Sequence, residues 1–148
     1  MAGKARKTTT NETKKSLIRR YFRAYGAGGQ NAVNEFLHPK HKYYPPGESD
    51  AMSLEERVRD ESVFFKAFSN IRTTVQDQVA EGRKVVSRVK MVADHTGEYQ
   101  NFAPTGRPVT FAFIDFSTIS SGKIIEEWAE FDMMSVLGQL RAAAKRQR

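Results

Sequence analysis

Apolar side chains first recur with a helical period between residues 11 and 25. Leu17, Tyr21 and Tyr25 follow one another at four-residue steps, so they form an apolar stripe on one side of a helix. Asn11 is a suitable N-cap at its start. The glycines within residues 26–29 end the pattern, because glycine is the commonest residue just beyond a helix.

Two further helices are predicted before residue 70. A short one covers residues 31–37, and His38-Pro39 stops it. A longer one begins at Ser53-Leu54-Glu55-Glu56, a capping box in which the Ser hydroxyl and the Glu carboxylate satisfy each other's exposed amides. Its apolar side chains fall on one side of the helix: Leu54, Val58, Phe65 and Phe68.

After Asn70 the period of the apolar positions changes to two, which is typical of half-buried strands. The alternation predicts four strands, at residues 71–79, 84–93, 109–119 and 124–133, and a closing helix at residues 135–144. Helices followed by a four-strand meander, without βαβ alternation, indicate an α+β fold.

Length and charge suggest one domain with basic ends. The 148 residues suit a single domain, which we place at residues 11–144, between a flexible basic tail at 1–10 and a basic tail at 145–148. The chain has a formal net charge of +7, but residues 1–20 and 141–148 carry more than this excess, so the body is net negative. The tails could contact phosphates without sequence preference; we favour solvated ends and expect no specific nucleic-acid partner.

Several classes of protein and site are disfavoured by what the sequence lacks. There is no cysteine, so no disulfide or thiolate site can form. No apolar run approaches the roughly 20 residues of a membrane span, and no hydrophobic segment follows the basic N-terminus; a cytoplasmic protein fits. His38 and His41 do not form a metal site with His95, and no phosphate-cradling glycine motif is present. We expect no cofactor and no metal.

Five short segments, in this order and spacing, carry a family resemblance. They are Leu17-Ile18-Arg19-Arg20-Tyr21-Phe22, His95-Thr96-Gly97-Glu98, Pro104-Thr105-Gly106-Arg107, Gly122-Lys123-Ile124-Ile125-Glu126-Glu127-Trp128 with Asp132, and Leu137-Gly138-Gln139-Leu140. Together they resemble the SnoaL-like polyketide cyclases, a branch of the nuclear transport factor 2-like superfamily, over about residues 12–140.

The resemblance implies a cone-like half-barrel, in which a curved antiparallel sheet holds a hydrophobic pocket under its N-terminal helices. It also implies a homo-oligomer, dimer or tetramer, built on the outer sheet face. The implied chemistry is cofactor-free ring closure by intramolecular aldol condensation, with one aspartate as general acid and base. Where the family usually has a Met-Gly-Ile-Pro-Pro-like loop, this chain has Gln100-Asn101-Phe102-Ala103-Pro104. Asn tolerates a left-handed backbone, so the turn can form without its glycine.

The last hairpin offers a candidate catalytic residue. Pairing Ile119 with Ile124 across the turn places Phe111 opposite Asp132, on the face that carries Trp128. A carboxylate beside these rings in a pocket would have a raised pKa and act as a stronger base. The alternative is that Asp132 caps the helix after it. One bulge would exchange the two faces of the strands.

Five further residues are candidates for substrate binding, each with a structural alternative. Trp128 would form a pocket wall or plain core, and Asp115, about 13 Å along the sheet from Asp132 and so too far for a dyad, would be a polar pocket residue. Tyr21 and Tyr25 would donate hydrogen bonds to a carbonyl or pack in the core. His95 would orient substrate or assist proton transfer, or lie in a surface turn.

The sequence therefore favours an enzyme but leaves other functions open. The first hypothesis is a cyclase or isomerase for a polyketide-like hydrophobic carbonyl compound. An epoxide hydrolase or ketosteroid isomerase-type enzyme on the same fold is the second. A non-catalytic domain that binds a small hydrophobic ligand is the third, since one scaffold hosts many roles.

Overall fold

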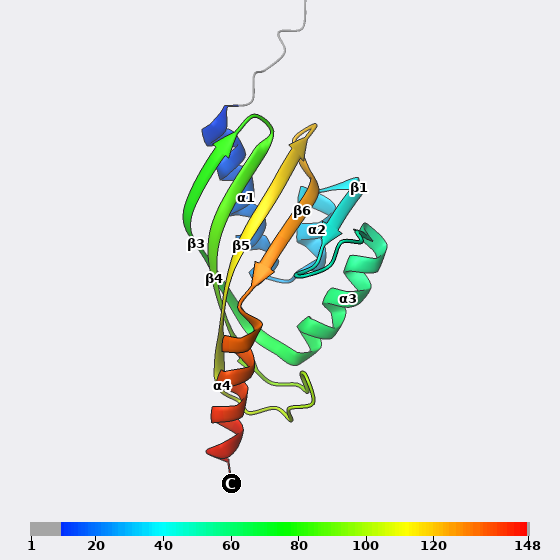
Figure 1. The fold of residues 1–148 in the computed structure, drawn as a ribbon. Coiled ribbons are helices and arrows are strands. Elements are labelled where there is room, and N and C mark those ends of the chain that lie inside the picture. The colour runs from blue at the N-terminus through cyan, green and yellow to red at the C-terminus, as the bar shows by residue number, and fades with distance from the viewer. Residues whose placement is uncertain (1–9, 148) are drawn as a thin grey trace, which may run out of the picture.

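The computed structural model describes residues 10–147, and Figure 1 shows their arrangement as one curved sheet with helices against it. Its elements are α1 (Asn11–Gly26), α2 (Gln30–Phe36), β1 (Leu37–Tyr44), β2 (Met52–Ser53), α3 (Leu54–Ala67), β3 (Phe68–Glu81), β4 (Lys84–His95), β5 (Pro108–Ser120), β6 (Lys123–Phe131) and α4 (Met133–Lys145). The predicted N-terminal tail lies outside the described residues, apart from Thr10. None of the described helices is long and apolar enough to cross a membrane.

The sheet has the strand order β2-β1-β6-β5-β4-β3, and β1 runs parallel to β6 while the other pairs are antiparallel. This confirms the predicted α+β fold and its curved, unclosed sheet, and the four-strand meander is β3 to β6. The strands β1 and β2 were not expected from the sequence. The first of them, β1, contains Pro39, which has no amide donor. The strand tolerates this residue because the ladder between β1 and β6 is interrupted from Leu37 to Lys42.

The helix ends follow the capping rules, with small shifts from the predicted bounds. Thr10, one residue before the expected N-cap, accepts a hydrogen bond from the amide of Thr13. The capping box of α3 is confirmed, since Ser53 accepts from the amide of Glu56 and the Glu56 carboxylate accepts from the amide of Ser53.

A bulge in the last hairpin changes which residues share a face. Ile119 pairs with Ile124 as expected, but the next pair is Thr118 with Glu126, so Ile125 is an extra residue on β6. The expected position of Asp132 opposite Phe111 is therefore wrong, because the last pair is Phe113 with Phe131 and the amide of Asp132 donates to the carbonyl oxygen of Ala112. The same unbulged register would have put Asp115 opposite Trp128, whereas Asp115 lies opposite Ala129.

The helices cover the concave face of the sheet and enclose the core with it. In Figure 1, α1 and α2 lie across this face, and α3 passes from β2 at one edge of the sheet to β3 at the other. The core combines side chains from α1, α2 and the inner faces of β4, β5 and β6, among them Ile18, Phe22, Phe36, Val89, Phe111 and Ile124.

The helix α4 completes the sheet where β6 ends. The side-chain amide of Gln139 donates to the carbonyl oxygen of Thr110 and accepts from its amide, each at 2.8 Å, as a neighbouring strand would. Beyond the bounds of α4, Gln147 donates to the carbonyl oxygen of Thr105. The loop before β5 makes its turn with Gln100 and Asn101 at positive φ, 51° and 64°, as the sequence allowed.

Candidate functional site

An arginine lies fully inside the molecule, between α3 and the sheet. Arg57 is 3% exposed and occupies the apolar side of α3. Its Nε donates to Glu61 Oε1, its Nη1 to Glu127 Oε2 and its Nη2 to the hydroxyl of Tyr21, each at 2.7 Å. A buried charge is expensive unless it is paired and hydrogen-bonded, and here the guanidinium meets both conditions.

The same guanidinium fixes the tautomer of a buried histidine. Arg57 Nη1 lies 2.7 Å from His41 Nε2, and His41 Nδ1 lies 2.9 Å from the carbonyl oxygen of Ile124. Because arginine only donates, Nε2 must accept and Nδ1 must carry the proton. Burial lowers the pKa of His41, and the positive charge of Arg57 lowers it further. His41 is therefore neutral in the folded protein.

Two neighbouring carboxyl groups on β5 and β6 differ in protonation. Burial and then the negative charge of Glu127 raise the pKa of Asp115 well above its usual range. Burial also acts to raise the pKa of Glu127, but the Arg57 guanidinium outweighs it and lowers that pKa. Ser117 donates a hydrogen bond to Asp115 Oδ2 at 2.7 Å, and no donor reaches Asp115 Oδ1 among the described residues. When Asp115 carries a proton, it can donate a hydrogen bond to the Glu127 carboxylate.

The third carboxyl group, Glu61, borders a cavity under the sheet. Burial raises the pKa of Glu61, although Arg57 acts against this shift. The cavity, which we call the inner cavity, has a volume of about 280 Å³. It is lined by Tyr25, Tyr43, Asp60, Glu61, Val63, Phe64, Met91, Tyr99, Gln100, Phe111 and Phe131. A largely aromatic wall with three tyrosines and two carboxyl groups, of which Glu61 is largely buried and Asp60 is exposed, suits a hydrophobic ligand with few polar atoms.

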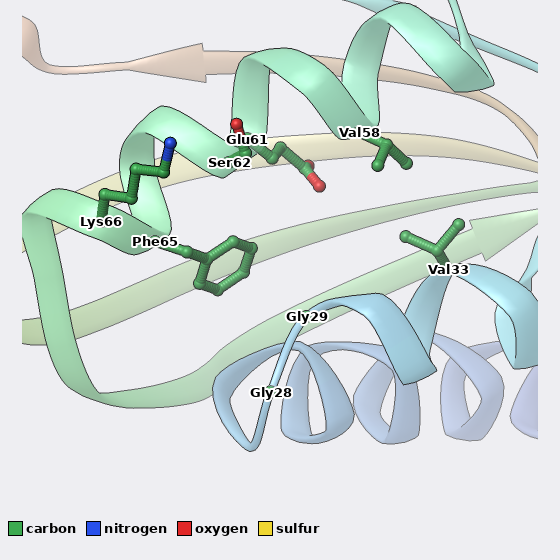
Figure 2. A pocket seen from close by; sticks show the side chains of 8 residues that line it. All are labelled: Gly28, Gly29, Val33, Val58, Glu61, Ser62, Phe65 and Lys66. Carbon is green, nitrogen blue, oxygen red and sulfur yellow. The ribbon is translucent and has the colours of Figure 1, made fainter.

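Glu61 also borders a second cavity, which lies between α2 and α3. This cavity, the α2–α3 cavity, has a volume of about 420 Å³, and Figure 2 shows its walls. It is lined by Gly28, Gly29, Val33, Val58, Glu61, Ser62, Phe65 and Lys66. In Figure 2, Val58 of α3 and Val33 of α2 extend toward each other across the gap. The carboxyl group of Glu61 lies between these two valines and the ring of Phe65.

The structure places Asp132 at the N-terminus of α4. Its carboxylate accepts a hydrogen bond from the amide of Ser135 at 3.0 Å, which is the capping geometry of the alternative reading. Asp132 is exposed, so it is not the buried carboxylate beside aromatic rings that the sequence predicted. A catalytic role for Asp132 stays a prediction.

Trp128 faces the outer side of the sheet, away from both cavities. Because of the extra residue Ile125, it lies opposite Phe116 and not Asp115. Trp128 is 39% exposed, and its ring stacks on that of Tyr44, with ring centroids 3.7 Å apart. The expected arrangement of Trp128 beside Asp132 in a dry pocket is not what the structure shows.

The other four candidates lie inside the molecule, in three different environments. Tyr25 lines the inner cavity, whereas Tyr21 lies beneath it with its hydroxyl on Arg57. Asp115 is fully buried and belongs to the polar cluster around Arg57, which we define as Tyr21, His41, Arg57, Glu61, Asp115 and Glu127. His95 is fully buried at the end of β4, where its Nδ1 lies 3.1 Å from the hydroxyl of Thr105; it lines neither cavity. Their roles in substrate binding stay predictions.

Sequence reasoning missed the residues at the centre of the site. Arg57 and Glu61 stand at positions that belong to the apolar stripe of α3, between Leu54 and Phe65. Charged residues four apart on the buried side of an amphipathic helix are the signal that could have found them. Within residues 10–147, no group of three His, Cys, Asp or Glu residues is arranged to hold a metal ion.

Comparisons with known proteins agree with this architecture. The model of the SnoaL-like polyketide cyclase family matches residues 15–140. None of the curated proteins matches the sequence.

Three solved structures illustrate how similar the fold is. AclR, a candidate hydroxylase from Streptomyces galilaeus, superposes with a TM-score of 0.81 at 23% identity, covering 90% of this chain and 98% of its own. A candidate SnoaL-like polyketide cyclase from Jannaschia sp. CCS1 has a TM-score of 0.79 at 21% identity, covering 95% and 99%. IdmH, a candidate polyketide cyclase from Streptomyces antibioticus, has a TM-score of 0.78 at 24% identity, covering 86% and 98%. At these identities the likeness shows the fold.

The burial of Arg57 can be tested against an exposed pair on the same helix. Arg57→Met removes the partner of buried carboxylates, so we expect a loss of about 3–5 kcal/mol in the free energy of unfolding. Arg59→Met is the control, because Arg59 and Glu55 are also four residues apart but are exposed; it should cost less than about 1 kcal/mol. Urea denaturation at pH 7 measures both. Equal losses would contradict the role given to Arg57.

The neutral state of His41 predicts a pH dependence. The unfolded chain protonates His41 near pH 6.5, whereas the folded protein resists protonation to a lower pH. The contribution of neutral His41 to the free energy of unfolding is therefore fully present above pH 6.5. It declines as the pH falls from there toward the lowered pKa of the folded state. His41→Gln should flatten the fall in unfolding free energy between about pH 6.5 and 5, and His38→Gln, at a partly exposed position on the same strand, should not. An unchanged slope in His41→Gln would exclude this assignment.

Proposed function

Because the chain belongs to the SnoaL-like polyketide cyclase family, we propose that it catalyses cofactor-free ring closure or isomerisation of a hydrophobic carbonyl compound in the inner cavity. The observation that carries the proposal is the carboxyl group of Glu61, which is largely buried, borders this cavity and is held by Arg57 at 2.7 Å. A proton-transfer group fixed at the wall of an apolar cavity is what such chemistry requires.

Glu61 is the carboxyl group of the cluster that can exchange its proton with a ligand. One guanidinium neutralises one carboxylate, and Glu127 has this role because it is the carboxyl group whose pKa is lowered. Asp115 has a raised pKa but is fully buried and lines neither cavity. Glu61 combines a raised pKa with a place at the cavity wall. A base whose pKa lies closer to the working pH transfers protons more efficiently.

The proposed reaction needs one acid–base group and two carbonyls of the same substrate. The Glu61 carboxylate removes a proton from the carbon next to the first carbonyl, and a tyrosine hydroxyl, from Tyr25 or Tyr43, donates a hydrogen bond to the enolate oxygen that results. The enolate carbon then forms a bond to the second carbonyl carbon, whose oxygen becomes an alkoxide. Glu61 returns the proton to this alkoxide, so no oxidant or external base is consumed.

The cavity walls support a planar, apolar substrate. Phe64, Tyr99, Phe111 and Phe131 supply aromatic faces and edges on which a conjugated ring can stack. The apolar part of the wall limits the water that would otherwise compete for the enolate. The same walls would serve a non-catalytic binding protein, which the following experiment distinguishes.

Proton abstraction can be measured without knowing the natural substrate. We expect the protein to exchange the methyl protons of 6-methoxy-2-acetonaphthone for deuterium in D₂O, followed by NMR, and Glu61→Gln to slow this exchange by about 10²–10⁴-fold. Asp132→Asn is the matched comparison, because Asn caps a helix as well as Asp and should leave both stability and exchange unchanged.

The reverse result, with exchange lost in Asp132→Asn and kept in Glu61→Gln, would assign the acid–base role to Asp132, as the family resemblance implied. Binding of the ketone without exchange in the wild-type protein would favour a ligand-binding function.

We further propose that the protein forms a homo-oligomer through the outer face of its sheet. Ile114, Phe116 and Trp128 are 42%, 37% and 39% exposed on this face. Phe116 lies opposite Trp128 across β5 and β6, and Trp128 lies beside Tyr44 of β1, so the aromatic side chains are contiguous. Contiguous exposed apolar side chains on a sheet are typical of an interface.

A charge introduced on this face should separate the subunits. We expect Phe116→Glu to give a monomer by sedimentation velocity at a concentration where the wild-type protein is oligomeric, because a hydrated carboxylate would replace an apolar ring of the interface. Met134→Glu, at a position 72% exposed on α4, is the control and should leave the oligomer intact. A monomeric wild-type protein would contradict the proposal.

A further inference from the structure

Two cavities meet at a single carboxyl group. Glu61 lines the inner cavity from one side and the α2–α3 cavity from the other. The other residues that line the α2–α3 cavity come from α3, from α2 and from the glycine turn between α1 and α2, and none of them lines the inner cavity. The two cavities therefore adjoin at Glu61, and the rest of their linings differ.

Two aromatic rings contact each other close to the place where the cavities adjoin. Tyr25 of the inner cavity and Phe65 of the α2–α3 cavity contact each other, with ring centroids 5.1 Å apart. Phe65 in turn lies against Gly29, where a Cβ atom would come within 2.6 Å of the ring. At Gly28 a Cβ atom would meet nothing within 4 Å. The absence of a side chain at Gly29 thus makes room for the Phe65 ring, and the space next to Gly28 is open.

The walls of the α2–α3 cavity match an uncharged apolar group. Val33, Val58 and Phe65 supply its interior, and Lys66, which is exposed, stands at its edge (Figure 2). At about 420 Å³ the α2–α3 cavity is larger than the inner cavity and falls within the 300–1,000 Å³ usual for ligand sites. A molecule with its carbonyl at Glu61 and an apolar extension would fill both spaces.

We propose that the α2–α3 cavity is a second ligand compartment, which takes the apolar tail of a carbonyl compound whose reacting part lies in the inner cavity. This rests on the proposed function, because the carbonyl end is placed by Glu61. The substrate is then an elongated molecule, and the tail length that the protein accepts is set by Val33, Val58 and Phe65. The inner cavity alone would select compact ring systems.

The experiment compares two fluorescent ketones that differ only in the acyl chain. These are 2-dimethylamino-6-propionylnaphthalene and its dodecanoyl analogue, whose emission reports transfer into an apolar site. We expect the wild-type protein to bind the long-chain ketone at least about tenfold more tightly, since each buried methylene adds several-fold in affinity. Dissociation constants are measured below the concentration at which the long-chain ketone aggregates.

Substitutions that fill the α2–α3 cavity identify where the tail binds. Ser62→Trp places a large ring there from an exposed position of α3, and Val33→Phe fills it from α2. Both should abolish the advantage of the long chain and leave the affinity for the short-chain ketone unchanged. Glu35→Trp adds the same indole to an exposed position of α2 that lines neither cavity, and it should preserve the advantage.

The outcomes separate this inference from the proposed function. Equal affinities for the two ketones in the wild-type protein, or a long-chain advantage that survives in Ser62→Trp, would overturn the second compartment while leaving the inner cavity and Glu61 untouched. If neither ketone binds the wild-type protein, the inner cavity is not a site for carbonyl compounds, and both proposals fail.

Discussion

The guanidinium of Arg57 contacts four different elements of the structure. It reaches Glu61 on its own helix, Tyr21 on α1, His41 on β1 and Glu127 on β6. A planar group with five donors can make this set of contacts, and a lysine cannot, because its ammonium has three donors on a single nitrogen. The guanidinium therefore ties α3 to α1 and to two strands of the sheet. Both cavities are affected by this link, since α3 supplies a wall of each.

The same charge divides the buried acids into separate roles. Arg57 keeps Glu127 ionised, and the ionised Glu127 helps to keep Asp115 protonated. Glu61, the remaining carboxyl group, shares the guanidinium with Glu127 and is therefore less fully compensated for its burial. Different environments push the pKa values of neighbouring carboxyl groups apart, which is the usual way in which an active site obtains an acid and a base from like residues. In this protein the pKa is lowered at Glu127 and raised at Asp115 and Glu61, and of these three groups Glu61 lines the inner cavity.

Local rules predicted the local features of the fold, and long-range packing decided the rest. The capping box of α3 and the period-two strands could be read because they depend on neighbouring residues. The strand around Pro39 could not, because its pairing with β6 is distant in sequence. The extra residue Ile125 has no signal of its own, yet it turned Trp128 outward and removed the indole from the expected site. Arg57 and Glu61 were missed because the buried side of the helix was expected to carry apolar residues. In the structure, Glu127 on the sheet pairs with the charge of Arg57.

The amide of Gln139 has a consequence for how the sheet meets other chains. By occupying both hydrogen-bonding groups of Thr110, it closes the stretch of β5 that extends past the end of β6. An uncovered stretch of this kind is a template on which a foreign strand can add, and sheet proteins commonly protect such edges. A single side chain, delivered by a helix, performs the task here. Strand addition at this place is blocked in the folded protein, and the outermost strands of the sheet are β2 and β3.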